Sequence, residues 1–331
     1  MKYANLGKTG INVSRICVGG MSFGEVFSGG HQWTLDQDET QKMLAHAFEL
    51  GVNFIDTANT YAGGTSEEFI GKALKNLGIA REKVIIATKV FFNLTTKEHL
   101  TKRAIESEID GSLRRLGTDY VDLYQIHRFD YDTPIEETMS ALHELVKSGK
   151  VRALGASAMY AYQFHNMQIA AEKNNLTPFS TMQNHYNLLY REDEHELIPV
   201  CEQYNVSLIP FSPLAGGHLS HKSWDSDSKR ANSDKVLAAK YDRSRENDLL
   251  IIERVAELAA KHNVSMSEIA LAWHFSKGVT SPIVGATKIS HFDQAAKSVD
   301  MNLSDTEVAY LEELYVPHEI VGQIKRDGSM Y

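Results

Sequence analysis

The chain has 331 residues, of which 43% are hydrophobic and 23% are charged. This composition is ordinary for a globular protein and provides enough apolar material for a large core. The formal net charge of −9 argues against nucleic acid or an anionic membrane as a partner. The two cysteines, Cys17 and Cys201, cannot form a disulfide scaffold, and we expect both to be buried free thiols. No stretch resembles a signal peptide or is apolar enough to span a bilayer, so we expect a cytoplasmic protein.

Short β-rich runs alternate with helical runs along the chain. Apolar residues at helical spacing, such as Met43, Leu44, Ala47 and Phe48, mark the buried faces of the helices. We expect strands at residues 15–21, 53–58, 83–89, 120–127, 151–157, 179–186, 206–213 and 281–287. We expect helices at residues 36–51, 66–78, 95–116, 133–149, 160–173, 192–204, 245–262 and 290–298, and a last helix from Ser304.

Several of these helices carry a start signal in the sequence. A Ser, Thr or Asp N-cap followed three residues later by Glu forms a capping box, and Pro is favoured at the first helical position. Gly51 supplies the stop of the first helix. The expected N-caps and their partners are Asp36 with Glu39, Thr95 with Glu98, Thr133 with Pro134, and Ser304 with Glu307.

The pattern counts to eight strand–helix units. Runs such as VIIA at 84–87 and SLIP at 207–210 are apolar on consecutive residues, as in parallel strands covered on both faces. Eight parallel strands with crossover helices predict an α/β fold, the (β/α)8 TIM barrel. A doubly wound sheet is the alternative, and the count disfavours it. We expect one domain over residues 1–331 with extra C-terminal helices, and a mobile loop over the functional site at 221–247.

Reactive side chains follow three neighbouring strands of the expected barrel. Asp56 ends the second strand with Tyr61 just beyond it, Lys89 ends the third, and His127 ends the fourth. The active sites of such barrels lie at the C-terminal ends of the strands. Each residue alone has a structural explanation: the acid as a turn former, the lysine as a solvated strand end, the histidine as a core residue. Together they form a set that can protonate an oxygen as it becomes anionic.

The chemistry of this set depends on the lysine. A free phenol has a pKa near 10 and is a poor proton donor at neutral pH. A lysine ammonium about 4 Å away stabilises the phenolate by up to about 4 kcal/mol at an effective dielectric of about 20. Asp56 would keep Lys89 protonated, and His127 would direct a substrate oxygen at the phenol of Tyr61. This arrangement predicts carbonyl reduction, with the hydride supplied by a cofactor because no side chain donates one.

The expected cofactor segments lie after the first, seventh and eighth strands. GGMSFG at 19–24 is not G-x-G-x-x-G, so the dinucleotide fingerprint is absent. Barrels of this kind bind phosphates with the loops after strands seven and eight. FSPLAGGHLS at 211–220 has small residues that bring backbone N–H groups near a pyrophosphate, and Lys288 precedes a helix N-terminus. Tight turns explain the same glycines, so both interpretations remain open at this point.

These segments resemble the aldo-keto reductases over nearly the whole chain. Residues 51–74 (GVNFIDTANTYAGGTSEEFIGKAL) resemble the first signature of that family, 84–89 (VIIATK) its lysine segment, and 122–127 (DLYQIH) its histidine strand. Residues 207–219 (SLIPFSPLAGGHL) and 281–295 (SPIVGATKISHFDQA) are similar to its two cofactor segments. The resemblance implies a TIM barrel that binds an extended nicotinamide cofactor without a Rossmann motif, usually NADPH, with NADH also possible.

The resemblance also implies a role for particular residues. Ser157 and Gln183 would hold the nicotinamide carboxamide, and Phe211 would pack on the nicotinamide ring. The implied catalytic tetrad is Asp56, Tyr61, Lys89 and His127, with Tyr61 as proton donor. The other implied cofactor contacts are Gly20, Met21 and Asp56 near the nicotinamide, Ser212, Leu214, Gly216 and Leu219 along the pyrophosphate, and Gly285, Thr287, Lys288 and Gln294 around the adenosine end.

Two positions depart from the family pattern. Ala158 follows Ser157 where an asparagine is usual, so one carboxamide contact would be lost. His291 stands where a basic residue is common, which leaves Lys288 as the main candidate to bind a 2′-phosphate. The short first loop and the tail PHEIVGQ (317–323) are more similar to bacterial sugar- and aldehyde-reducing members than to animal steroid or aldose reductases.

We expect an NADP-dependent oxidoreductase that reduces an aldehyde or ketone, such as a sugar or another small polar carbonyl, to an alcohol. The alternative is a cofactor-binding, redox-sensing regulatory subunit, because the potassium-channel β-subunits share this fold and also resemble the sequence. A barrel isomerase or metal-dependent hydrolase is disfavoured, since the sequence has neither H-E-x-x-H nor a His-x-His pair on the first strand, and we predict no metal site. The sequence does not specify the substrate or the oligomeric state. We expect substrate specificity to come from loops 26–33, 91–99 and 221–247, with Trp33, Phe92 and Trp224 as walls.

Overall fold

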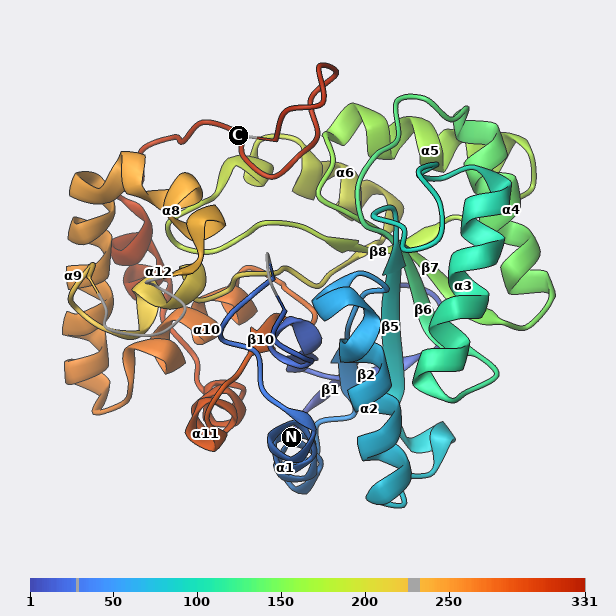
Figure 1. Ribbon diagram of the computed structural model, residues 1–331. Coiled ribbons are helices and arrows are strands. Elements are labelled where there is room, and N and C mark those ends of the chain that lie inside the picture. The colour runs from blue at the N-terminus through green and yellow to red at the C-terminus, as the bar shows by residue number, and fades with distance from the viewer. Residues whose placement is uncertain (28–29, 226–232, 331) are drawn as a thin grey trace.

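The computed structural model describes residues 1–27, 30–225 and 233–330. Its centre is an eight-stranded parallel sheet in the order β10-β3-β4-β5-β6-β7-β8-β9. Backbone hydrogen bonds from Ile283 to the carbonyl of Pro210 (2.9 Å) and from Thr280 to that of Leu208 (2.9 Å) join the two outermost strands. The sheet therefore curls into the predicted (β/α)8 barrel (Figure 1). The strands are β3 (Cys17–Gly19), β4 (Phe54–Asp56), β5 (Ile85–Val90), β6 (Val121–Ile126), β7 (Val151–Ser157), β8 (Phe179–Gln183), β9 (Ser207–Leu208) and β10 (Ile283–Gly285).

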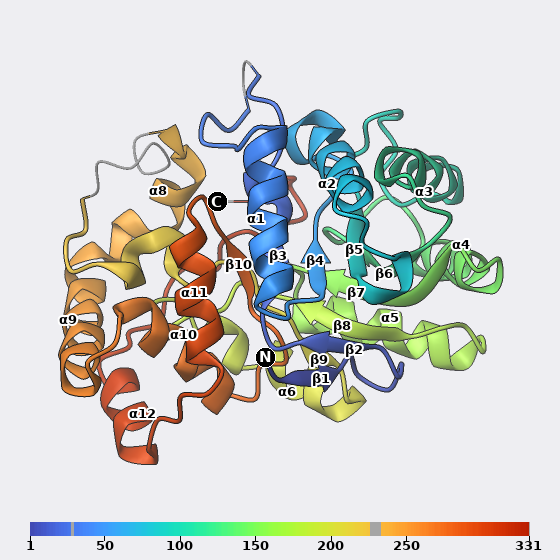
Figure 2. The ribbon, with the colours of Figure 1, turned by 90° about the horizontal axis from the view of Figure 1, so that it is seen from below.

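Helices follow the strands and surround the sheet (Figures 1 and 2). Successive helices pack on one another around the ring, because each buries one apolar face against the strands and its neighbours. The helices are α1 (Gln37–Glu49), α2 (Thr65–Asn76), α3 (Lys102–Leu116), α4 (Ile135–Lys147), α5 (Ala161–Lys173), α6 (Leu197–Tyr204), α8 (Lys235–Tyr241), α9 (Arg245–His262), α10 (Met266–Ser276), α11 (Ile289–Ser298) and α12 (Asp305–Glu312).

The interior of the barrel is apolar below its C-terminal rim. Side chains from alternate positions of the strands, including Phe54, Ile85 and Leu123, form one buried cluster. A hairpin of β1 (Tyr3–Asn5) and β2 (Asn12–Ser14), which the sequence analysis did not predict, lies across the N-terminal end of the barrel (Figure 2). Residues of this hairpin join the interior cluster, so they close the end of the barrel opposite the strands' C-terminal rim.

The strand register brings polar residues together at that rim. Asp56 pairs with Gly19 on one side and with Ala87 on the other, while Lys89 pairs with Gln125. Parallel strands end on the same side of a barrel, so the residues that finish them share one opening. Both predicted thiols, at Cys17 and Cys201, are buried and free.

The capping boxes of the first and last helices are confirmed at Asp36 and Ser304. The expectation that Thr95 starts a helix is wrong: α3 begins at Lys102 with Thr101 as its N-cap. The hydroxyl of Thr95 instead donates a hydrogen bond to Glu108 within that helix (2.6 Å), a tertiary contact that outweighs the local capping pattern.

Two other expected helix starts also shift. The N-cap of α4 is Pro134 rather than Thr133, because the hydroxyl of Thr133 donates to the carboxylate of Asp130 (2.7 Å). The expected helix at 192–204 is divided into a short 3-10 turn at Glu192–Glu194 and the helix α6.

Helix α10 was missed by the sequence analysis. It begins with a capping box between Ser265 and Glu268, but its residues are buried on most sides and show no amphipathic stripe. The segment 221–247, predicted to be a mobile loop, contains α8 and the start of α9. Residues 226–232 of that segment lie outside the described part of the chain. Within the described part, no helix combines the length and the apolar character needed to cross a membrane.

Candidate active site

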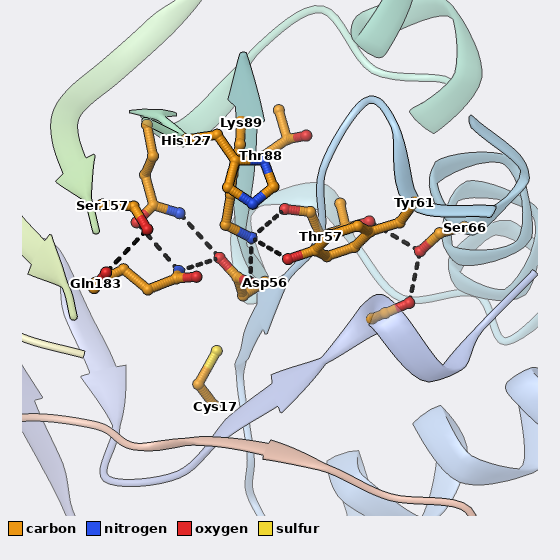
Figure 3. A network of polar contacts seen from close by, with 12 residues as sticks. Cys17, Asp56, Thr57, Tyr61, Ser66, Thr88, Lys89, His127, Ser157 and Gln183 are labelled. Atoms are coloured by element: carbon orange, nitrogen blue, oxygen red, sulfur yellow. Dashed lines mark hydrogen bonds and ion pairs between the residues drawn. The ribbon is translucent and has the colours of Figure 1, made fainter. Parts of the chain in front are cut away.

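The side chain of Lys89 is the centre of a polar network at the barrel rim (Figure 3). Its ammonium nitrogen donates to Asp56 Oδ2 (2.6 Å), to the backbone carbonyl of Thr57 (2.7 Å) and to the hydroxyl oxygen of Tyr61 (3.1 Å). All three protons of the ammonium group are therefore used. The structure thus brings three members of the predicted tetrad into direct contact around a lysine that is fully buried.

The carboxylate of Asp56 is held from both sides. Its Oδ2 receives Lys89, while its Oδ1 accepts from the side-chain amides of Gln125 (2.9 Å) and Gln183 (2.8 Å). A buried carboxylate with several donors is fixed in orientation, and here it lies against the ammonium group of the lysine. Gln125 was not predicted, because nothing in DLYQIH marks its glutamine as inward-facing before the register with Lys89 is known.

Electrostatics favour a charged lysine beside a neutral histidine. Burial opposes the charge of Lys89, but the carboxylate of Asp56, together with the hydrogen bonds to Asp56 and Tyr61, outweighs it and raises the lysine pKa above its ordinary value. Burial, together with the positive charges of Arg128 and Lys89, lowers the pKa of His127 well below 6.5. At neutral pH the site therefore holds an ammonium group and an uncharged imidazole, which can donate a single N–H.

His127 lies at the end of β6, next to the phenol. The Tyr61 and His127 rings meet edge to face with centroids 5.8 Å apart, and the Phe92 ring lies edge to face with His127 at 5.3 Å. The backbone N–H of His127 donates to the carbonyl of Val90 (2.8 Å), which continues the ladder between β5 and β6 past the last strand residue. The fourth predicted tetrad member thus lies beside the other three, between two aromatic rings.

The loop that carries Tyr61 follows β4 through a tight turn. Ala62 has φ 48°, and Gly63 and Gly64 also have positive φ, so the chain can turn sharply into α2. The hydroxyl of Ser66 donates to the carbonyl of Gly20 (2.7 Å), which ties the start of α2 to the rim residues after β3. This turn places the Tyr61 hydroxyl against the ammonium group of Lys89, while the side chain of Tyr61 stays partly exposed.

The residues predicted to hold a nicotinamide carboxamide lie next to this network. Ser157 and Gln183 pair across β7 and β8, and the Ser157 hydroxyl donates to the backbone carbonyl of Gln183 (2.8 Å). The amide nitrogen of Gln183 is used by Asp56, whereas no hydrogen bond within the described chain uses its side-chain oxygen. Ala158 has φ 41°, a conformation that asparagine tolerates better than alanine does.

Phe211, predicted to pack on a nicotinamide ring, is half-buried and nearly parallel to His185, with centroids 5.1 Å apart and planes 10° apart. The ammonium group of Lys240 in α8 lies 4.7 Å from the centre of the Phe211 ring. A planar ligand that packs on the outer face of this ring therefore requires Lys240 to move aside. Helix α8 thus lies beside Phe211, while the cover of a cofactor by segment 221–247 stays a prediction.

The loop after β9 has a backbone suited to a phosphate group. Ser212, Ala215, Gly216 and Gly217 all have positive φ. Such runs turn backbone N–H groups toward one concave side, where an anion can bind. A Cβ atom on Gly216 would lie 2.0 Å from a terminal methyl group of Leu237, which would have to shift, and the φ of 68° at this position also favours glycine. Of the other residues predicted here, Leu214 is half-buried and Leu219 is fully buried.

The adenosine end of the predicted site is open to solvent. Gly285, Thr287 and Lys288 are exposed, and Lys288 is the N-cap of α11. His291 is half-buried, and burial together with the charge of Lys288 lowers its pKa. The remaining predicted contacts are the half-buried Gln294 on α11 and, near the nicotinamide end, the buried Gly20 and the half-buried Met21.

The three predicted substrate walls differ in their surroundings. Phe92 faces His127, as described above. Trp224 is buried and stacks on His218 with centroids 4.1 Å apart, so it packs its own segment. Trp33 is also buried and lies 4.8 Å from the ring of His31. Phe92 is thus in contact with a predicted catalytic residue.

Known proteins resemble the chain over nearly its whole length. A profile of the Aldo/keto reductase family matches residues 15–316. Versiconal hemiacetal acetate reductase of Aspergillus parasiticus is 41% identical over 97% of this chain and 98% of its own. Aldo-keto reductases of Metarhizium robertsii (40% identical, 97% of this chain, 92% of its own) and Alternaria alternata (39%, 95% and 91%) are similarly close. The chain belongs to the aldo/keto reductase family, the oxidoreductases that the sequence resemblance had indicated.

Proposed function

We propose that the protein reduces an aldehyde or ketone to an alcohol with NADPH as the hydride donor and Tyr61 as the proton donor. The observation that carries this proposal is the contact of the Tyr61 hydroxyl with the buried ammonium group of Lys89 (3.1 Å), which Asp56 holds in turn (2.6 Å). The name of the Aspergillus parasiticus relative supports a carbonyl substrate, because a hemiacetal is in equilibrium with its parent carbonyl compound.

The residues present fit a nicotinamide nucleotide. The side-chain oxygen of Gln183 can accept from a carboxamide, the loop of positive-φ residues at 212–217 can receive a pyrophosphate, and Lys288 stands at a helix N-terminus. When bound, such a cofactor supplies the hydride that no side chain can give. We propose Ser157 and Phe211 as further contacts of the nicotinamide, and Gly285, Thr287 and Gln294 as contacts of the adenosine.

The protein's own residues handle the proton. Neutral His127 donates its N–H to the carbonyl oxygen and directs that oxygen toward the phenol. As negative charge develops on this oxygen, Tyr61 transfers its hydroxyl proton, and the ammonium group of Lys89 stabilises the phenolate that remains. Asp56 keeps that ammonium group charged throughout. The fold therefore holds the proton donor in contact with the groups that stabilise its phenolate.

The test is Tyr61→Phe, which removes the hydroxyl and leaves the ring. We expect turnover of aldehydes to fall by about 10²- to 10⁴-fold, as for the loss of a general acid, while NADPH affinity stays within about twofold. Turnover is followed by the loss of NADPH absorbance over a panel of carbonyl compounds, and affinity by quenching of protein fluorescence. Turnover at the wild-type rate in this variant would refute the proton-donor role of Tyr61. A wild-type protein that binds NADPH tightly but turns over no carbonyl would refute the enzymatic function.

A further inference from the structure

Glu108, on the inner face of α3, is a buried carboxylate that joins two loops of the barrel rim. It is 1% exposed. Its Oε2 accepts from the side-chain amide of Asn59 (2.8 Å). Its Oε1 accepts from the backbone N–H groups of Leu94 (3.1 Å) and Thr95 (3.0 Å) and from the Thr95 hydroxyl (2.6 Å). The two oxygens thus receive four donors, which is the full acceptor capacity of a carboxylate.

No positively charged side chain pairs with Glu108 in the part of the chain that the structure describes. An unpaired carboxylate is costly to bury, and only its hydrogen bonds offset that cost. Each lost donor would therefore leave part of the carboxylate uncompensated. The two loops must for this reason keep the positions in which their donors reach Glu108. The hydrogen bonds to Glu108 thus fix the loop after β4 relative to the loop after β5.

Both loops lead directly to the candidate catalytic centre. Asn59 is fully buried and lies between Asp56 and Tyr61 in the loop after β4. Leu94 and Thr95 follow Phe92 in the loop after β5. The rings of Tyr61 and Phe92 both lie edge to face with His127, at 5.8 and 5.3 Å, so they flank the imidazole.

We propose that Glu108 and Asn59 are positioning residues for carbonyl reduction, which fix the loop of Tyr61 against the loop of Phe92 around His127. Neither residue touches the reacting atoms. The pair sets how a carbonyl compound fits between the phenol, the imidazole and the Phe92 ring. This inference rests on the proposed reductase function, and it assigns part of the substrate fit to a contact outside the tetrad.

The side chain of Asn59 allows a stringent test. Its Oδ1 makes no hydrogen bond within the described chain, while its Nδ2 donates to Glu108. In Asn59→Asp, a carboxylate oxygen replaces that donor and opposes the carboxylate of Glu108. In the exchange Asn59→Asp with Glu108→Gln, the new glutamine amide can donate to the aspartate, and its oxygen can still accept from Leu94 and Thr95.

We expect Asn59→Asp to lower kcat/KM for aldehydes by about tenfold or more, chiefly through a higher KM, while NADPH affinity stays within about twofold. We expect the exchange variant to regain kcat/KM to within about threefold of wild type, since it restores a donor–acceptor pair. Thr95→Val removes the 2.6 Å hydroxyl bond to Glu108 and a 3.3 Å bond with the hydroxyl of Ser107, both at an exposed residue, and we expect it to fold and to raise KM by a few-fold.

The outcomes separate the two proposals. An active wild-type protein whose Asn59→Asp variant keeps the wild-type kcat and KM overturns the positioning role alone. Failure of the exchange to restore kcat/KM, or an equal loss of NADPH affinity in Asn59→Asp, overturns it as well. If Asn59→Asp does not fold, an unchanged KM in Thr95→Val does the same. A wild-type protein with no carbonyl turnover overturns the reductase function, and the positioning role with it.

Discussion

The two halves of the barrel rim differ in how much of their chemistry the protein holds in place by itself. At the C-terminal ends of β4, β5 and β6, the side chains of Asp56, Lys89 and Gln125 are buried, and Asp56 is hydrogen-bonded to both others. After β10, the residues predicted to meet the adenosine, such as Thr287 and Lys288, are exposed. Proton transfer depends on fixed donor–acceptor geometry, so its groups must be preorganised, whereas a large ligand can order exposed groups as it binds.

Lys89→Met tests the preorganised half and should have the largest effect on stability. Removal of the ammonium group leaves Asp56, which is 2% exposed, as a buried carboxylate without its cation. Breaking a buried pair in this way costs about 3–5 kcal/mol in the free energy of unfolding, measured by denaturant titration. The variant should also lose carbonyl turnover.

The control removes both charges. Asp56→Asn combined with Lys89→Met should recover most of the lost stability, because no uncompensated carboxylate remains, but it should stay inactive. A Lys89→Met protein as stable as wild type would show that the pair is not desolvated as the structure describes.

His274 tests, through its response to pH, the half of the rim after β9 and β10, which we propose binds the nucleotide and call the nucleotide half. Its Nε2–H donates to the carbonyl of Pro213, in the loop after β9 (3.3 Å), and burial lowers its pKa from 6.5 to about 4. Between these values the unfolded chain binds a proton that the folded protein does not. Stability is therefore complete above pH 6.5 and falls as the pH drops toward 4.

The matched variant is His274→Gln, which keeps a donor but does not titrate. At about 1.4 kcal/mol for each unit of pKa, wild type should lose roughly 3 kcal/mol relative to this variant as the pH falls from 6.5 to 4. Urea unfolding of both proteins at the two ends of that range measures the difference. A constant difference across the range would mean that His274 is not buried in its neutral form.

The candidate catalytic centre and the surroundings of His274 also show which parts of the structure the sequence could predict. Asp56, Lys89 and His127 were found because each ends an apolar run, and strand ends gather at one rim whatever the details of packing. Helix α10, which carries His274, was missed because it is buried on most sides and lacks the apolar stripe on which the prediction depends. The bond between Asn59 and Glu108 joins residues 49 positions apart, so no local pattern could reveal it. Thr95 shows the converse, since a valid capping pattern was overridden by such a contact.

Tyr241→Phe tests how α8 is attached to the nucleotide half. The Tyr241 hydroxyl is hydrogen-bonded to His185 Nε2 (2.7 Å) and accepts from Asn187 (2.9 Å), and His185 lies against Phe211. Loss of the hydroxyl leaves buried partners unsatisfied and should cost about 1–3 kcal/mol in the free energy of unfolding. We also expect weaker NADPH binding by a few-fold, measured by fluorescence quenching.

The control is Tyr310→Phe, which deletes a hydroxyl that donates to Glu257 at the surface of α12. It should change stability by less than about 0.5 kcal/mol and leave NADPH affinity unchanged. Equal effects of the two phenylalanine variants would mean that the buried position of Tyr241 contributes nothing specific.

Lys288→Ala should have the smallest effect and should separate the two nicotinamide cofactors. A lysine at a helix N-terminus does not complement the helix dipole, so its position there suits the binding of an anion rather than helix stability. An exposed contact with a phosphate is worth about 1 kcal/mol, so affinity for NADPH should fall about fivefold while affinity for NADH stays constant. Lys297→Ala, an exposed lysine near the other end of α11, controls for net charge. A fall of equal size for both cofactors in Lys288→Ala would mean that this residue does not recognise the 2′-phosphate, and that the open half of the rim does not select between the two cofactors through it.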